Sequence, residues 1–358
     1  MSIVILADDL SGAAELAGIA FARGLATEVQ RTFEPASPAE VIAVDTDSRH
    51  LPAADAAARV AAVARQIAAS QPAWIFKKVD SVLRGNVRVE IEAILKATGQ
   101  QQAVLVPANP SRGRTIARGQ YLVDGLPLDQ TQFAQDPEYP RRSAQIADLL
   151  GGESAAIAVP DVASLDDVGR CAQEQGDQSL AAGAVDFFAA LLDRRVSRPA
   201  GSAGSAEFVL PRPALLVCGS RLSWRRRSEE CLAAGVSVQT LAADLPSAGS
   251  QLAATGRILL GIGDIQSPLD SRELLSHLAQ LTAQVMNRTP LAALLAEGGA
   301  TAAAIASVLG WQRFAVTAQA PSGVGILQPL TPAPAPLLLI KPGSYAWPEK
   351  IWRQFAAR

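Results

Sequence analysis

Short apolar runs rich in β-branched residues alternate with alanine-rich stretches of helical pattern along most of the chain. Residues 3–6 have the pattern of a buried strand, and residues 11–22 have that of a helix. Further strands are expected at 41–44, 74–76, 103–106, 214–217, 257–262, 291–295 and 337–340. Strands and helices in succession predict mainly parallel sheets flanked by helices, which is the α/β class.

A length of 358 residues suits two domains. The stretch 198–206, rich in serine, glycine, proline and alanine, interrupts the alternation and is the best linker candidate. We therefore expect an N-terminal domain over 1–197, a linker over 198–212 and a C-terminal domain over 213–358. Two α/β domains imply an interdomain cleft, where small molecules commonly bind. Segment 109–140 also breaks the alternation and is expected to be a long functional loop.

The amino-acid composition limits the classes of partner that we expect for this protein. Hydrophobic residues make up 49% of the chain, and 32 basic against 34 acidic residues give a net charge of −2. Nucleic acid is therefore not an expected partner. A membrane is not expected either, because no apolar run approaches the roughly 20 residues of a membrane span. The first residues lack the basic start of a signal peptide, which predicts a cytoplasmic protein. Homo-oligomerisation is left open.

Polar side chains follow each predicted strand of the first half. In open parallel sheets, ligands bind beyond the carboxyl ends of the strands. The residues at these ends are Asp8, Asp9, Asp45, Asp47, Ser48, Arg49, Lys77, Lys78, Asp80, Ser81, Arg84, Asn109, Ser111, Arg112 and Arg114. Any one of them could merely cap a helix or line a polar loop. Together they predict a ligand site at this edge of the sheet.

The charges at this edge suit a small, anionic, hydroxylated ligand. Arg49, Lys78 and Arg84 are expected to grip a carboxylate, and neither Arg49 nor Lys78 has an acidic partner in helical register. Asp9 and Asp80 are expected to accept hydrogen bonds from hydroxyls, and one of them to take a hydroxyl proton. The alternative is that both aspartates only hold the ligand.

Three small-residue turns follow predicted strands in the second half. They contain Ser220, the pair Gly298 and Gly299, and Gly343. Glycines let a backbone approach a phosphate, and the start of a helix attracts anions. A tight turn with close helix packing is the alternative. The three successive arginines at 225–227 are interpreted as a solvated helix face.

Several motifs resemble those of the four-carbon acid sugar kinases. Residues 7–13, Ala-Asp-Asp-Leu-Ser-Gly-Ala, are similar to the family's N-terminal motif, with Ser11 in place of threonine. Segments 45–49 and 77–86 resemble its next two signatures, and 107–140 resembles its long substrate-side loop. Segments 218–220, 298–301 and 341–343 fall where the family binds ATP.

The resemblance implies an N-terminal domain that binds a sugar acid and a C-terminal domain that binds ATP. It implies transfer of the γ-phosphate to the terminal hydroxyl of an acid such as D-threonate, D-erythronate or 3-oxo-tetronate, with ATP and Mg²⁺ as cofactors and the magnesium ligands unknown. The predicted acid site comprises Asp8, Asp9, Arg49, Lys78, Asp80, Ser81, Arg84, Asn109 and Arg114, with Asp80 and Asp9 as the candidate bases. The predicted nucleotide site comprises Ser220, Gly298, Gly299, Ala300, Thr301 and Gly343.

Two departures from the family pattern keep alternatives open. Ala300 stands where the family usually has an acidic residue, and Ser-Tyr-Ala at 344–346 replaces a Gly-Phe-Gly-like continuation. Ala300 favours a non-catalytic sugar-acid-binding paralogue with a degenerate ATP site. A second alternative is a magnesium-dependent phosphohydrolase that uses Asp8 and Asp9. Titration with ATP discriminates among these, because the kinase requires nucleotide binding.

Overall fold

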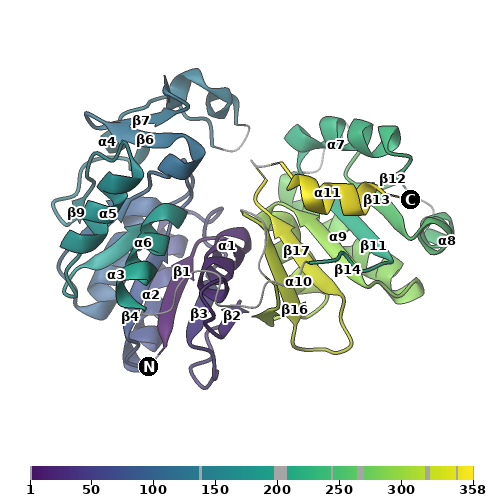
Figure 1. Ribbon diagram of the computed structural model, residues 1–358, viewed down its shortest axis with the longest axis horizontal. Coiled ribbons are helices and arrows are strands. Elements are labelled where there is room, and N and C mark those ends of the chain that lie inside the picture. Colours follow the sequence, from purple (N-terminus) through teal and green to yellow (C-terminus); the bar gives the residue numbers. More distant parts are fainter. Residues whose placement is uncertain are drawn as a thin grey trace. The chain divides into compact units, whose positions relative to one another are not determined.

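The computed structural model describes residues 2–136, 139–196, 208–242, 245–263, 270–318, 323–343 and 346–357. The chain forms two compact units (Figure 1), one of Met1–Thr27 and Arg31–Ala203, the other of Glu28–Gln30 and Gly204–Arg358. Most of the predicted linker lies outside the described residues, so its boundaries and the interdomain cleft stay predictions. Every described helix is too short or too polar to cross a membrane.

The first unit is built on a parallel sheet, as the alternation predicts. Its strand order is β3-β1-β4-β10-β5-β9, with every neighbouring pair parallel. The strands are β1 (Ile3–Ala7), β3 (Val41–Asp45), β4 (Trp74–Lys78), β5 (Ala103–Val106), β9 (Ile157–Ala158) and β10 (Leu180–Gly183). The four strands expected in this half are confirmed to within two residues. The short apolar run of β10, which carries no β-branched residue, gave no strand signal in the sequence.

Helices cover both faces of this sheet. They are α1 (Leu10–Phe21), α2 (Ala53–Ala69), α3 (Val87–Thr98), α4 (Ile146–Leu149), α5 (Leu165–Glu174) and α6 (Val185–Arg195). Side chains alternate along a strand, so Lys77 of β4 meets Glu90 of α3 while Lys78 faces Glu15 of α1. Phe76 shares the face of Lys78 and contacts Phe187 and Phe188 of α6. Helix α3, which packs on α2, therefore covers one face, and α1 and α6 cover the other.

Segment 109–140 is not the single long loop expected from its polar composition. It contains a three-stranded antiparallel sheet, β6-β7-β8. The elements are η1 (Pro110–Arg112), β6 (Arg114–Ala117), β7 (Gln120–Val123), β8 (Leu126–Pro127), η2 (Leu128–Gln130) and η3 (Gln132–Gln135). The turns between the strands carry Arg118 and Asp124 at positive φ, each followed by glycine. Two of the glycines that suggested a loop, Gly119 and Gly125, therefore mark tight turns between short strands.

The second unit has a mixed sheet. Strands β12-β13-β11-β14-β17 are parallel, and β16, β15 and β2 continue the order with antiparallel pairing. The strands are β2 (Thr27–Gln30), β11 (Ala214–Cys218), β12 (Ser237–Thr240), β13 (Arg257–Gly261), β14 (Ala293–Glu297), β15 (Arg313–Val316), β16 (Gly325–Pro329) and β17 (Leu337–Lys341). Strand β2 comes from the N-terminal part of the chain and pairs with β15. The α/β class with mainly parallel sheets is confirmed.

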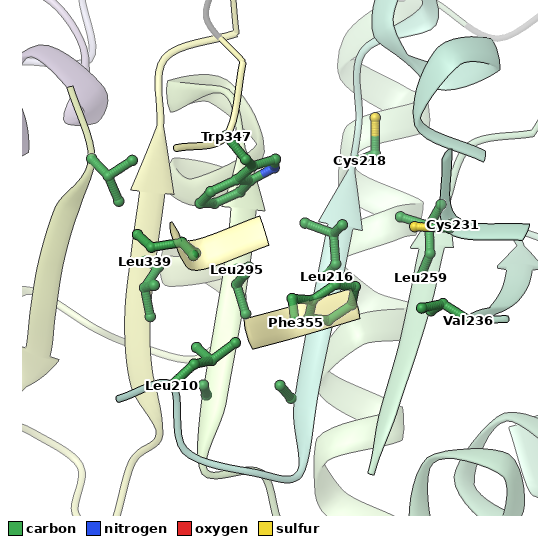
Figure 2. Packing of buried hydrophobic residues seen from close by; sticks show 14 of the residues in the cluster. Leu210, Leu216, Cys218, Cys231, Val236, Leu259, Leu295, Leu339, Trp347 and Phe355 are labelled. Atoms are coloured by element: carbon green, nitrogen blue, oxygen red, sulfur yellow. The ribbon is translucent and has the colours of Figure 1, made fainter. Parts of the chain in front are cut away.

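The core of the second unit lies under its last helix. The helices are α7 (Arg221–Ala233), α8 (Leu245–Thr255), α9 (Ser271–Arg288), α10 (Gly299–Val308) and α11 (Glu349–Ala356). Figure 2 shows Leu216, Leu259, Leu295 and Leu339 on adjacent strands, with Phe355 of α11 packed over them. Helices α9 and α10 contact each other, and α10 packs on β14 and β17. The packing of the sheet fixes the strand ends from which the glycine turns leave.

Candidate functional site

The predicted acid site begins where three parallel strands end at the same level. Ala7, the last residue of β1, is in register with Asp45 of β3 and with Lys78 of β4. The loops that follow therefore start side by side and bring Asp8, Asp9, Arg49 and Asp80 together. Asp8, Asp9 and Asp80 are buried, and the side chain of Arg49 is 11% exposed. The convergence expected from the strand pattern is present.

Arg49 links the three aspartates. Its Nε and Nη2 donate to the two oxygens of Asp8 at 2.7 and 2.9 Å, and its Nη1 donates to Asp9 Oδ2 at 2.8 Å. Nη1 also lies 3.8 Å from Asp80 Oδ1. Burial alone would raise the pKa of Asp8, but the charge and hydrogen bonds of Arg49 outweigh it and lower this pKa. The sequence shows no acidic partner for Arg49 because its partners come from two other strand ends.

Asp80 is held by its own loop. Arg84 donates from Nε and Nη2 to the two oxygens of Asp80 at 3.0 and 2.7 Å, and the amides of Val82 and Arg84 also donate to Oδ2. Positive φ at Leu83 (60°) and Gly85 (83°) folds the loop back in this way. Burial would raise the pKa of Asp80, but the charges of Arg84 and Arg49 hold it well below its usual range.

Asp9 also begins helix α1. It is the N-cap residue, and its Oδ1 accepts from the amide of Gly12 at 2.8 Å while Oδ2 accepts from the hydroxyl of Ser11 at 2.6 Å. A Cβ on Gly12 would lie 2.9 Å from Asp9 Oδ1 and 3.3 Å from Cγ of Lys78. The small residue of the motif therefore keeps room for the aspartate and the lysine.

The remaining predicted acid-site residues lie nearby in different roles. Lys78 Nζ donates to the carbonyl of Val79 at 2.7 Å and lies 3.8 Å from Glu15. Arg114 donates to the hydroxyl of Ser81. Asn109 accepts from the amide of Asp186 at 3.1 Å, at the start of α6. These bonds organise the loops around the aspartates.

Two features of this region went unrecognised in the sequence. Lys77 Nζ lies 2.5 Å from Glu90 Oε2, and Ser48 donates to the other oxygen of Glu90 at 2.7 Å, all three being buried. Asp45 is buried with Oδ2 3.8 Å from Arg31 Nε, and burial together with Asp47 raises the pKa of Asp45 to about 8. Lys77 is a charged residue inside an apolar strand, and this is the signal that could have revealed its buried pairing with Glu90.

The second sheet brings together the glycines of the predicted nucleotide site. Gly298 follows β14 with a φ of 102°, and its amide donates to the carbonyl of Lys341 at the end of β17. A Cβ on Gly343 would lie 4.0 Å from the Cα of Gly298. A Cβ on Gly219 would lie 2.5 Å from Oγ1 of Thr301. Gly299 is the first residue of α10, and Ser220 caps α7 by accepting from the amide of Ser223.

Beneath this glycine turn lies a buried ion network. Glu297, fully buried, accepts from Arg227 Nε at 2.8 Å, lies 3.2 Å from Lys341 Nζ, and accepts from Trp347 Nε1 at 3.3 Å. Burial would raise the pKa of Glu297, but Lys341 and Arg227 lower it. The solvated-face interpretation of the arginine run is wrong for Arg227, which is 2% exposed. It holds for Arg225 and Arg226, which lie on the exposed side of α7.

The described residues fit the two implied cofactors, ATP and Mg²⁺, to different degrees. The close approach of Gly298 and Gly343 leaves backbone without side chains at a helix start, which suits a phosphate. Ala300 provides no carboxylate in the first turn of α10, and Glu297 is engaged by Arg227 and Lys341. Among the described residues, no group of three or more histidine, cysteine, aspartate or glutamate side chains could hold a metal ion.

Comparison with known sequences identifies relatives. A family model described as a sugar-binding N-terminal domain matches residues 3–196, more than half of the chain. The D-threonate kinase of Cupriavidus necator is 31% identical over all of this chain and 98% of its own length. The D-erythronate kinase of Heliobacterium modesticaldum is 38% identical over 43% of this chain, and a 3-oxo-tetronate kinase of Brucella melitensis is 29% identical over 44%. These last two matches span only 36% and 38% of the relatives' own lengths.

Solved structures share the fold. A Haemophilus influenzae protein superimposes with a TM-score of 0.71 over 99% of both chains at 17% identity. A domain of unknown function from Bordetella bronchiseptica, solved with bound citrate as a domain-swapped dimer, is 29% identical with a TM-score of 0.51, over 99% of this chain and 98% of its own. With the match over residues 3–196 and the full-length relative, these findings show that the chain belongs to the four-carbon acid sugar kinase family.

Proposed function

We propose that the protein is a kinase that transfers the γ-phosphate of ATP to the terminal hydroxyl of a four-carbon sugar acid. The observation that carries this proposal is that one chain contains two features. One is the cluster of aspartates and arginines at the strand ends of the first unit, and the other is the side-chain-free turn at Gly298 and Gly343 in the second. Relatives named for D-threonate, D-erythronate and 3-oxo-tetronate support this substrate class.

The acid site suits a hydroxylated anion. Asp8, Asp9 and Asp80 supply acceptors for hydroxyl groups, and Arg49 and Arg84 balance their charge. The related Bordetella structure holds citrate, a compound that carries both carboxylates and a hydroxyl. We propose that Arg49, Lys78 and the loop from Asp80 to Arg84 contact the substrate, with Ser81, Asn109 and Arg114 supporting that loop.

The proton acceptor is proposed among the aspartates. A primary hydroxyl does not ionise near neutral pH, so a carboxylate beside it is the natural base. Asp80 is the weaker candidate because its lowered pKa and four hydrogen bonds stabilise the charged form. Asp9 carries three hydrogen bonds from Ser11, Gly12 and Arg49. We therefore propose Asp9 as the base and Asp80 as the residue that fixes Arg84.

ATP supplies the phosphoryl group when it is bound. The backbone at Gly298, Gly299 and Gly343, with the side chains of Ser220 and Thr301, is proposed to hold its phosphates, and Ala300 lies in the same first turn of α10. Mg²⁺ commonly binds through substrate phosphates and one or two carboxylates. We propose that it arrives with ATP.

The alternatives have less support. A phosphohydrolase would need Asp8 and Asp9 for a metal, but Arg49 occupies both oxygens of Asp8. A paralogue with a degenerate nucleotide site is favoured only by Ala300, because the glycine turn itself is formed.

The test is an assay of the pure protein with MgATP and each of D-threonate, D-erythronate and 3-oxo-tetronate. The expected result is acid-dependent release of ADP, with the phosphorylated acid identified by mass spectrometry. Asp9→Asn should lower kcat by roughly two to four orders of magnitude, and Asp80→Asn by less. ATP binding without transfer to any of the acids would contradict the proposal. Acid binding without ATP binding would favour the non-catalytic paralogue.

Assembly and location are secondary proposals. The domain-swapped dimer of the Bordetella relative supports a homo-oligomer. Light scattering during size-exclusion chromatography would measure its molar mass. Dependence on ATP favours a cytoplasmic location, which fractionation of cells that express the protein would test.

A further inference from the structure

A cavity of about 590 Å³ opens in the first unit beside the acid site. One wall is the start of α3 from Gly85 to Val89, and the other is the segment from Pro140 to Gly151. This volume lies within the range of small-molecule sites. Gly85, which lines this cavity, also packs against the acid site, because a Cβ added to it would lie 3.1 Å from Cγ of Arg49.

The charge of this cavity is positive. Arg88, Arg141 and Arg142 line it, against Asp148 alone among acidic residues in its wall. Asp148 accepts from Ser143, and Arg88 lies 3.4 Å from Glu92. The start of α3 adds to the positive potential, because the side chain of Asn86 donates to the carbonyl of Leu51 at 2.9 Å and leaves the helix without a side-chain cap.

Arg141 differs from the arginines of the acid site in its partners. Arg49 and Arg84 are paired with carboxylates, whereas Arg141 donates from Nε to the carbonyl of Tyr139 at 2.9 Å and from Nη1 to that of Leu83 at 3.1 Å. No carboxylate of the described residues lies within ion-pair distance of it. A guanidinium has five N–H donors, so three remain. Burial lowers the pKa of Arg141, as expected for a cation without a close counterion.

The position of Arg141 relates it directly to the proposed chemistry. It is bonded to Leu83, which precedes Arg84, and Arg84 grips Asp80. The Cζ of Arg141 lies 5.9 Å from the ring centroid of Tyr139. The hydroxyl of Tyr139 donates to the carbonyl of Arg49 at 2.7 Å. Arg141 is therefore tied to the loop that carries Asp80 and Arg84, and Tyr139 is tied to Arg49.

We propose that this cavity receives the carboxylate of the acid substrate and that Arg141 is the residue that binds it. The inference rests on the proposed function for the identity of the ligand. It also gives a reason for the pairing of Arg49 and Arg84 with aspartates: these two arginines organise acceptors for the hydroxyl end, and Arg141 is left to recognise the charged end. An arginine fork suits a carboxylate because it donates two parallel hydrogen bonds.

The test is calorimetric titration of the full chain, without ATP, with D-threonate, D-erythronate and the uncharged polyols threitol and erythritol. Arg141→Gln should weaken binding of the preferred acid by about 10- to 100-fold, the range for loss of a charged hydrogen bond, and leave polyol binding unchanged. Arg141→Lys, which keeps the charge but loses the fork, should fall between. Arg142→Gln is the matched control, since Arg142 is an exposed arginine in the same wall, and should change affinity less than threefold.

Equal weakening of acid and polyol by Arg141→Gln in a folded protein would overturn the assignment. So would equal loss from Arg142→Gln, which would indicate only a general positive potential. A wild-type protein that binds none of the acids would overturn it as well. Because the titration needs no ATP, its outcome is separate from that of the kinase assay. Arg141-dependent acid binding without phosphate transfer would refute the kinase alone, and transfer unaffected by Arg141→Gln would refute the assignment alone.

Discussion

At the scale of single residues, the proposed acid site is a set of buried charges that neutralise one another. Asp8, Asp9 and Asp80 share Arg49, and Asp80 also pairs with Arg84. Each pairing joins groups from different loops or from opposite ends of one loop. Breaking a buried ion pair by removing one partner is costly because the other charge remains buried. Residues of this predicted site therefore contribute to stability, in addition to the ligand binding proposed for them.

Arg49→Ala should lower the free energy of unfolding by about 3–5 kcal/mol near pH 7, because it leaves Asp8 and Asp9 buried beside each other. The wild-type pKa of Asp8 is lowered, so its stabilising contribution is present at neutral pH and is lost as the pH falls through the folded-state value. The deficit of the variant should therefore shrink toward pH 3. Urea denaturation at several pH values measures it, and a deficit constant with pH would argue against this origin.

Asp45→Asn should stabilise the protein increasingly as the pH rises. The folded-state pKa of Asp45 is raised to about 8, above the ordinary value of 3.8, so the wild type loses stability as the pH rises between these values. Asparagine carries no charge and keeps an acceptor for the amide of Asp47. The advantage of the variant should grow by about 1.4 kcal/mol per pH unit from pH 4 to pH 8. Asp47→Asn should give a smaller gain of the same sign, because burial is the larger cause of the raised pKa and Asp47 the second.

At the scale of elements, the proposed nucleotide site depends on two turns, at Gly298 and Gly343, that approach each other without side chains. Gly298 is confined to glycine by its φ of 102°, whereas Gly343 has no such backbone requirement, and a Cβ on it would lie 4.0 Å from the Cα of Gly298. A substitution at Gly298 therefore tests backbone strain together with ligand binding, whereas a substitution at Gly343 tests ligand binding alone. The ion pairs of Glu297 with Arg227 and Lys341 connect the two turns, because Glu297 directly precedes Gly298 and Lys341 lies two residues before Gly343.

Gly343→Ala should fold with unchanged stability, because its Cβ would lie 4.0 Å from the nearest heavy atom, Cα of Gly298. If the ATP phosphates lie against this backbone, the added methyl should weaken ATP binding by at least about tenfold. Gly298→Ala should lower both stability and ATP affinity because of backbone strain. Calorimetric titration with ATP and thermal unfolding measure the two effects. Full ATP affinity in Gly343→Ala would move the phosphates away from this turn.

At the scale of the whole molecule, each proposed site is built within one compact unit. Acid-site residues come from the first unit, and the glycine turns come from the second. Strand β2 shows that the units are not simply consecutive in sequence, since Glu28–Gln30 pairs with β15 and Glu28 with Arg313. A cut of the chain near residue 204 would therefore remove a strand from the second unit.

Ground-state binding of the two ligands should consequently be separable. Gly343→Ala should abolish most of the thermal stabilisation by ATP and keep that by the acid, and Arg141→Gln should do the reverse. Stabilisation by a ligand follows from its affinity for the folded state alone. Thermal unfolding of both variants with each ligand measures this, and loss of both stabilisations in either variant would show that the sites are coupled.

The chain's own residue pattern determined the α/β class, the position of most of the parallel strands and the polar residues at their ends, because these depend on local periodicity and turn chemistry. The tertiary structure alone decided which charges meet. Arg49 pairs with Asp8 because β1 and β3 end in register, and Arg227 is buried while Arg225 is exposed because of how α7 is set on its sheet. The pairing of β2 with β15 likewise joins residues nearly 300 positions apart. Such contacts depend on strand order and helix orientation, which no local window of sequence contains.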